Sequence, residues 1–239
     1  MRMEPPERSR ILRSPPGATR KAPDLGVMLT FFDERAAERE AMVRFQMEAR
    51  DIRDPRVLRT LRAVPRHLFV PQASQVLAYE DHPLPLGPGQ TISQPYIVAF
   101  MAQALGLEGG ERVLEIGSGC GYFCAVLSLL AAEVFGIELD AGLAERSALH
   151  LQRLACANVH IRCGDGALGW AEEGPFDAVT LSCSAPELPE PLWDQLRTGG
   201  RALFPQNMGP GRQDLVLQIK TDAGAQTQSL LPVAFVPLR

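Results

Sequence analysis

A series of short apolar segments, separated by stretches of helix length, constrains the fold of this chain most. Five of these segments occupy residues 112–116, 133–138, 159–163, 176–182 and 201–205. Buried strands of a parallel sheet are short and apolar throughout, and a crossover, usually a helix, joins each strand to the next. Two further segments, residues 214–220 and 230–238, follow at hairpin-like distance, and we expect them to pair antiparallel at one edge. The sequence therefore predicts an α/β fold with a doubly wound, mostly parallel sheet.

The part of the chain before the sheet is helical at first and rich in proline later. Apolar side chains recur at helical intervals over residues 32–63, and Asp54-Pro55 marks a helix boundary, with Asp54 as N-cap and Pro55 in the first turn. Proline-rich connecting sequence fills residues 64–95, and a further helix is predicted over residues 96–105. We expect this part to form a helical cap on the sheet.

Residues 1–26 contain five prolines and little hydrophobic periodicity. We expect a disordered tail, or sequence upstream of the true start with Met42 as an alternative initiator. The net charge of the chain is −4, but residues 1–24 carry six basic and three acidic side chains, which leaves −7 for the body. A body of this charge argues against nucleic-acid binding.

Apolar runs and cysteine spacing indicate the compartment in which the protein works. No apolar run is long enough to cross a bilayer, and the N-terminus lacks the apolar core of a secretory signal. The five cysteines form no C-x-x-C motif, and no histidine or carboxylate near Cys120 and Cys124 completes a metal site. We therefore expect a cytoplasmic protein with reduced thiols, no metal and no membrane association.

A glycine-rich turn follows the first predicted strand in "LEIGSGCGY", residues 114–122. Gly117, Gly119 and Gly121 form a G-x-G-x-G pattern, and Glu115 precedes them within the strand. Such a turn lets a ligand approach the backbone closely and meet the N-terminus of the next helix. Dinucleotide-binding enzymes use G-x-G-x-x-G instead, so this spacing argues against a dehydrogenase.

Two more acidic residues follow successive predicted strands. Glu138 ends the second strand, where its carboxylate can accept both hydroxyls of a ribose, and Asp165 follows the third, where it can meet an adenine amino group beside the Gly166 amide. Any one of these acids alone could be a solvated residue at a strand end. Because the carboxyl ends of parallel strands meet at one edge, the three acids together predict an adenosine site. We infer S-adenosylmethionine, whose adenosine carries no pyrophosphate.

At this point the sequence resembles a known family. The residues that carry the resemblance are "VPRHLFVP" (64–71), "AYEDHPLPLGPGQTISQPYIVAFM" (78–101), "LEIGSGCGY" (114–122), "GDG" (164–166), "GPFDAV" (174–179) and "FVPL" (235–238). In this order they are similar to the protein-L-isoaspartate O-methyltransferase family. The glycine turn is common to class I methyltransferases, whereas the block over residues 78–101 is much narrower. The resemblance implies a Rossmann-like methyltransferase sheet.

The resemblance also implies an activity and a role for one loop. Gln90, Thr91, Ile92 and Ser93 would cover the cofactor, with Ser93 beside the substrate carboxylate. The implied reaction moves a methyl group from S-adenosylmethionine to the free α-carboxylate of an L-isoaspartyl residue in damaged protein, and the ester then closes to a succinimide. A peptide carboxylate, with a pKa of about 3–4, is already ionised and needs no general base, so the absence of an evident catalytic histidine is no objection. Alternatively, Ser93 merely caps the helix that follows.

The sequence departs from the family pattern in places that leave other functions open. "LSCSAPELPEPL" places Ser182, Cys183 and Ser184 near the expected substrate mouth, "FPQNMGPG" replaces a usual turn, and the sequence stops at Arg239 just after "FVPL". A related carboxyl methyltransferase for a dedicated peptide is one alternative. A non-catalytic protein that binds S-adenosylmethionine is another.

These expectations combine into one domain. Residues 27–239 would form a single methyltransferase domain, with the helical cap and active-site loop over residues 27–95 and the cofactor-binding sheet over residues 96–239. Proteins and peptides that contain isoaspartyl residues are the expected partners, and we expect a monomer.

Overall fold

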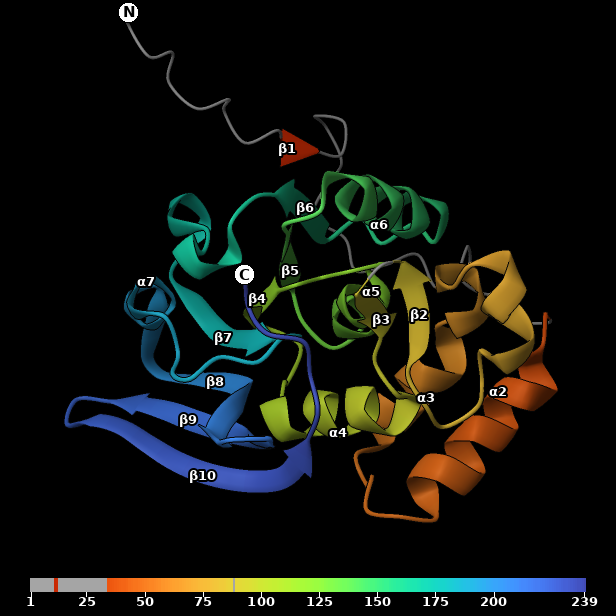
Figure 1. Ribbon diagram of the computed structural model, residues 1–239, viewed down its shortest axis with the longest axis horizontal. Coiled ribbons are helices and arrows are strands. Elements are labelled where there is room, and N and C mark those ends of the chain that lie inside the picture. Colours follow the sequence, from red (N-terminus) through yellow and green to blue (C-terminus); the bar gives the residue numbers. More distant parts are fainter. Residues whose placement is uncertain (1–10, 13–33, 88) are drawn as a thin grey trace, which may run out of the picture.

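The computed structural model describes residues 11–12, 34–87 and 89–239. An eight-stranded sheet with the order β1-β6-β5-β4-β7-β8-β9-β10 runs through the molecule (Figure 1). Its strands are β1 (Ile11–Leu12), β4 (Arg112–Ile116), β5 (Glu133–Glu138), β6 (Val159–Cys163), β7 (Phe176–Leu181), β8 (Leu196–Gly209), β9 (Arg212–Thr221) and β10 (Gly224–Val233).

The pairing of the strands confirms the predicted α/β sheet. Strands β6, β5, β4, β7 and β8 are parallel, whereas β9 runs antiparallel to β8 and β10 antiparallel to β9. All five predicted parallel strands and the antiparallel edge are therefore present. Within the described part of residues 1–33, β1 pairs antiparallel with β6. The rest of the expected tail lies outside the described residues.

The last predicted strand is wrong in its extent. The apolar run over residues 230–238 predicts one strand, but β10 ends at Val233. Beyond it, Phe235 exchanges its backbone hydrogen bonds with the Gln213 side chain instead of a strand, and Val236 and Leu238 bond to the backbone of Ser184. The C-terminal segment, residues 234–239, therefore turns away from the sheet edge.

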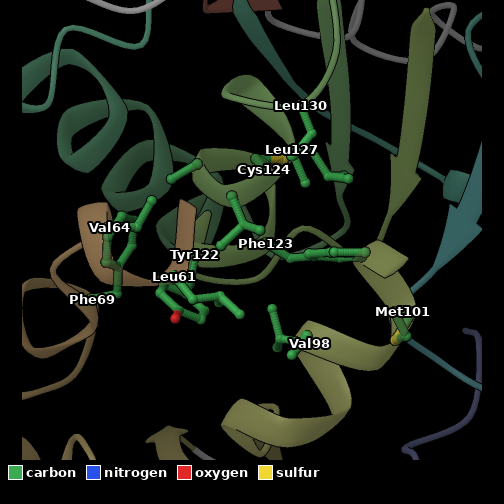
Figure 2. Packing of buried hydrophobic residues seen from close by; sticks show 14 of the residues in the cluster. Leu61, Val64, Phe69, Val98, Met101, Tyr122, Phe123, Cys124, Leu127 and Leu130 are labelled. Carbon is green, nitrogen blue, oxygen red and sulfur yellow. The ribbon is translucent and has the colours of Figure 1, made fainter. Parts of the chain in front are cut away.

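Both faces of the sheet are covered by apolar clusters, as a doubly wound fold requires. Helices α4 (Pro95–Leu105), α5 (Tyr122–Ser128) and α6 (Ala141–Arg153) contribute to the larger cluster, and α7 (Glu190–Asp194) contributes Leu192 to the smaller one. Figure 2 shows Tyr122 and Phe123 at the start of α5 in one cluster with the cap residues Leu61 and Phe69 and with Val98 of α4. The cap and the sheet therefore share one core.

The cap itself consists of α2 (Ala36–Met42), the π-helical η1 (Val43–Glu48), α3 (Pro55–Ala63) and the short 3₁₀ helices η2 (Arg66–Phe69) and η3 (Gln72–Leu77). The predicted boundary at Asp54-Pro55 is confirmed, because the Asp54 carboxylate accepts a hydrogen bond from the Arg56 amide at 2.8 Å. No helix in the described ranges is long and apolar enough to cross a membrane.

A hairpin stands where the sequence predicts only connecting loop. Strand β2 (Leu84–Gly87) pairs antiparallel with β3 (Gln90–Ile92). Glycine and proline disfavour the interior of a strand, which is why the sequence predicts a loop here. In the structure Gly87 lies at the end of β2 and Gly89 in the turn, with φ of 158° and 69°. Their freedom therefore serves the turn and leaves the strands short.

Candidate active site

A cleft of about 510 Å³ lies at the carboxyl ends of β4, β5 and β7. Its walls come from the β2–β3 hairpin, the glycine turn before α5, and the C-terminal segment. These three parts are far apart in sequence, and the sheet brings them together because its parallel strands end at one edge. The volume falls in the range of small-molecule sites, roughly 300–1,000 Å³.

The glycine turn presents backbone to this cleft. Gly117 and Gly119 line it with φ of 77° and 56°, and the Gly117 and Ser118 amides bond to the Ile137 carbonyl at 2.8 and 3.1 Å. A Cβ added at Gly119 would have no neighbour closer than 3.9 Å, the distance to Gly117 O and Leu86 Cδ1, so it would fit beside the cleft without overlap. That space is where a ligand can reach the backbone.

Gly121 serves a different purpose from the other two glycines. It does not line the cleft, and a Cβ there would lie 2.5 Å from Ser147 Oγ on α6. Its φ of 86° also disfavours any side chain. The third glycine therefore allows α5 to pack against α6.

Glu138 ends β5 with a buried carboxylate, 4% exposed, in the cleft wall. Its two oxygens accept hydrogen bonds from the Gly119 amide at 2.8 Å and the Asp140 amide at 2.9 Å. These bonds fix the carboxylate, and each oxygen keeps acceptor capacity for a hydroxyl. The neighbouring Leu139, which sequence reasoning missed, is 49% exposed and adds an apolar surface to the wall. The leucine directly after the acid in the sequence was the available signal.

The two residues predicted after β6 are placed differently. Gly166 lines the cleft, and a Cβ there would lie only 2.3 Å from Ile116 Cγ2. Asp165 is exposed and is absent from the cleft lining, while its Oδ1 accepts a hydrogen bond from the Ala167 amide at 2.9 Å. A contact between Asp165 and adenine stays a prediction.

Glu115 lies deeper, within β4, and is 1% exposed. Ser182 Oγ donates to its Oε1 at 2.8 Å, and the Cys124 thiol donates to its Oε2 at 2.9 Å. Burial raises the pKa of this carboxyl to about 7, and the charge of Glu138 adds to the rise, while the two hydrogen bonds oppose it. The cleft therefore holds two buried acids with different surroundings.

The hairpin brings all four of its predicted residues to the cleft. Gln90, Thr91, Ile92 and Ser93 line it, with Ile92 buried and Ser93 half-buried. Helix α4 begins at Pro95 with Gln94 as N-cap, so the alternative that Ser93 caps this helix is wrong. Among the described residues no hydrogen bond involves the Ser93 hydroxyl. It is available to a ligand.

The segment after β7 divides between the cleft and its support. Ser182 and Cys183 line the cleft, as the sequence indicated, whereas Ser184 is 2% exposed and accepts a hydrogen bond from Gln213 Nε2 at 3.0 Å. Gln213 Oε1 also accepts from the Phe235 amide at 2.7 Å. These contacts hold the C-terminal segment against the cleft, and sequence reasoning missed them because they join residues from three separate segments.

None of the four histidines lines this cleft. His67 is buried in the cap, where its ring nitrogen lies 2.7 Å from the Tyr79 hydroxyl. Within the described ranges, no group of three or more histidine, cysteine or acidic side chains could hold a metal ion.

Comparison with known proteins agrees with this geometry. The family model for protein-L-isoaspartate(D-aspartate) O-methyltransferase matches residues 37–239. A protein-L-isoaspartate O-methyltransferase 2 of Anaeromyxobacter sp. (strain Fw109-5) is 55% identical over 202 residues, which cover 84% of this chain and 83% of the relative. A protein-L-isoaspartate O-methyltransferase 1 of Geotalea uraniireducens (strain Rf4) is 46% identical over 211 residues, covering 88% and 96%.

Solved structures show the same likeness. One protein-L-isoaspartate O-methyltransferase superposes with a TM-score of 0.77 at 30% identity; the match covers 83% of this chain, and the chain spans 65% of that protein's length. A second, from Plasmodium falciparum and in complex with S-adenosyl-L-homocysteine, gives a TM-score of 0.73 at 27% identity and covers 84% and 98%. From the matched family model and from relatives of this identity, it follows that the chain belongs to the protein-L-isoaspartate(D-aspartate) O-methyltransferase family.

Proposed function

We propose that the cleft transfers a methyl group from S-adenosylmethionine to the free α-carboxylate of L-isoaspartyl residues in damaged proteins, and that Ser93 positions this carboxylate. The supporting observation is the position of the Ser93 hydroxyl. It has no hydrogen bond to the described residues and lines the same cleft as Glu138 and the glycine turn. A substrate carboxylate held there would face the cofactor region.

The residues present fit S-adenosylmethionine. Glu138 offers fixed carboxylate oxygens for ribose hydroxyls, Leu139 and Gly166 offer a flat apolar and backbone surface, and Gly119 leaves room for close approach. Gln90, Thr91 and Ile92 cover this region from the hairpin. When bound, the cofactor supplies a methyl group on a sulfonium, a strong electrophile.

The remaining tasks of the protein are alignment and exclusion of water. The substrate carboxylate, with a pKa of about 3–4, is ionised at neutral pH, so no side chain has to remove a proton. Ser93 can donate one hydrogen bond to one carboxylate oxygen and leave the other directed at the methyl carbon. Ile92, Phe123 and Phe235 give the cleft apolar walls that displace water.

We also propose that the protein works as a monomer in the cytoplasm. This chain itself supplies Glu138 and the glycine turn for the cofactor and Ser93 for the substrate carboxylate, so the proposed reaction requires no residue from a partner copy. All five cysteines are free, which supports a reducing compartment.

A methyl-transfer assay on two synthetic peptides of one sequence tests the function. One peptide carries L-isoaspartate and the other L-aspartate at the same position. We expect labelled methyl groups from S-adenosylmethionine on the isoaspartyl peptide alone. Methylation of neither peptide by a protein that binds S-adenosylmethionine in calorimetry would contradict the repair function and favour a dedicated peptide substrate.

A further inference from the structure

Glu115 is a buried acid whose neighbours offer it no positive charge. It is 1% exposed, and the described groups that act on its charge are the Cys124 thiol, the Ser182 hydroxyl and the Glu138 carboxylate. Burial of an ionised carboxylate away from water costs free energy unless a cation compensates its charge. Two neutral donors and a second carboxylate do not provide that compensation.

The groups around Glu115 come from four neighbouring parts of the chain. Cys124 comes from α5, Glu138 from β5, Ser182 and Cys183 from the segment after β7, and Cys120 from the glycine turn. Burial raises the pKa of Cys120 to about 11, that of Cys183 to about 12, and that of Cys124 well above its usual value. All three thiols therefore stay neutral near pH 7, and Glu138 opposes a second negative charge.

We propose that Glu115 carries a proton in the ligand-free protein and releases it to the solvent when S-adenosylmethionine binds. This inference rests on the proposed cofactor. S-adenosylmethionine brings one net positive charge, which stabilises the ionised form of a carboxylate in the same cleft. S-adenosylhomocysteine has lost the sulfonium charge, so Glu115 keeps more of its proton when the product is bound.

The proposal gives the cleft a pH-dependent preference for substrate cofactor over product. Below neutral pH, S-adenosylmethionine must displace the Glu115 proton in order to bind, whereas above neutral pH the carboxylate is already ionised. With an acid that titrates near pH 7, the ratio of the two dissociation constants shifts toward S-adenosylmethionine by roughly fivefold to tenfold between pH 6 and pH 7.5. Titration of the α-ammonium group of each ligand is the same with the wild type and with Glu115→Gln, so comparison of the two proteins removes it from this ratio.

Calorimetry in buffers with different ionisation enthalpies measures the released proton. At pH 6 we expect release of close to one proton for each S-adenosylmethionine bound, and a clearly smaller release for S-adenosylhomocysteine. In Glu115→Gln most of the release should vanish, and the affinity ratio should lose the fivefold to tenfold shift between pH 6 and pH 7.5. Glu172→Gln, which changes an exposed acid outside the cleft, is the matched control and should behave as the wild type.

Infrared difference spectroscopy of the wild type covers the case in which Glu115→Gln fails to fold. We expect a protonated carboxyl band at pH 6 in the ligand-free protein that disappears when S-adenosylmethionine is added. Binding with no buffer dependence and no change in this band would overturn the proton release. Failure to bind S-adenosylmethionine at all would instead overturn the proposed function.

Discussion

Glu138 illustrates how one residue can serve both the fold and the ligand. Its carboxylate accepts hydrogen bonds from the Gly119 and Asp140 amides, so it orders the glycine turn before any ligand arrives. The same rigidity makes it a prepared acceptor for ribose hydroxyls. With Glu138 on the ribose as proposed, substitution removes a ligand contact and a support of the glycine turn together.

We predict that Glu138→Ala weakens binding of S-adenosylmethionine by roughly 1.5–3 kcal/mol, since hydrogen bonds to a charged acceptor are lost. Titration calorimetry measures the loss, with Glu172→Ala as the matched control at an exposed acid. An unchanged affinity in Glu138→Ala would remove Glu138 from the cofactor site.

Ser93 should separate binding from turnover. We predict that Ser93→Ala binds S-adenosylmethionine almost normally but methylates isoaspartyl peptide ten- to hundredfold more slowly, because a hydrogen bond to a charged partner contributes about 1.5–3 kcal/mol. Ser93→Thr keeps a hydroxyl and should retain part of the activity. Single-turnover rates on protein of verified stability measure this effect, and a wild-type rate in Ser93→Ala would exclude the positioning role.

At the scale of elements, the glycine turn has two sides with different demands. Gly119 faces the cleft with room for an added Cβ, whereas Gly121 faces Ser147 on α6 with none. Both have positive φ, so an L side chain is strained at either position.

We therefore predict opposite main effects for two substitutions in this turn. Gly121→Ala should lower the free energy of unfolding by about 2 kcal/mol or more, because conformational strain adds to overlap with Ser147. Gly119→Ala should unfold at a higher denaturant concentration than Gly121→Ala but bind S-adenosylmethionine more weakly. Urea denaturation and calorimetry on both variants test this, and the reverse ranking would contradict the assignment of the two sides.

The C-terminal segment is an element held by one side chain. Gln213 donates to the Phe235 carbonyl at 3.1 Å and to Ser184 Oγ at 3.0 Å, and accepts from the Phe235 amide. In Figure 1 this segment leaves the end of β10 and runs back toward β4. It forms a wall of the cleft, so its anchoring should matter to substrate binding.

We predict that Gln213→Ala raises the KM for isoaspartyl peptide roughly fivefold or more, because each lost hydrogen bond contributes about 1 kcal/mol to holding the wall. Gln218→Ala, on the same strand and outside the cleft lining, is the control and should leave KM unchanged. Steady-state kinetics decides the question: an unchanged KM in Gln213→Ala would show that the wall needs no such anchor.

At the scale of the whole molecule, the cap and the sheet share a core that contains buried titratable groups. Burial lowers the pKa of His67 and of His150 below the usual 6.5. Both histidines are therefore neutral in the folded protein at pH values where the unfolded chain begins to bind protons. Glu115 acts in the opposite direction, since its raised pKa gives the folded state an extra proton between about pH 4.5 and 7.

We predict that the His67 contribution to stability is complete above about pH 6.5 and is lost as the pH falls below that value, because the unfolded state then binds a proton that the folded state does not. Urea denaturation from pH 7.5 to pH 5.5 should show a smaller loss of stability in His67→Gln than in the wild type. This comparison cancels the contribution of Glu115. The pKa of His82 is raised by its hydrogen bonds to the Pro83 carbonyl and to Glu80, so His82→Gln should lose stability at least as steeply as the wild type, opposite to His67→Gln; parallel curves for His67→Gln and wild type would refute the prediction.

Much of the fold was determined by the sequence alone, because the signals involved are local. The five apolar runs report buried parallel strands, Asp54-Pro55 reports a helix start, and the order of the motifs indicates the family. The sequence also predicts that Glu138 and the glycine turn lie close together, since the carboxyl ends of parallel strands meet at one edge whatever the side chains are.

Only the tertiary structure decided which residues share the cleft and in what state. Glu115 meets Ser182 across 67 positions of sequence, and Gln213 meets Phe235 after β10 has ended. The β2–β3 hairpin, the packing role of Gly121 and the exposed position of Asp165 also depend on how distant segments pack. A local pattern records the conformation of its own segment, whereas burial, charge and hydrogen-bond partners arise when separate segments exclude water between them.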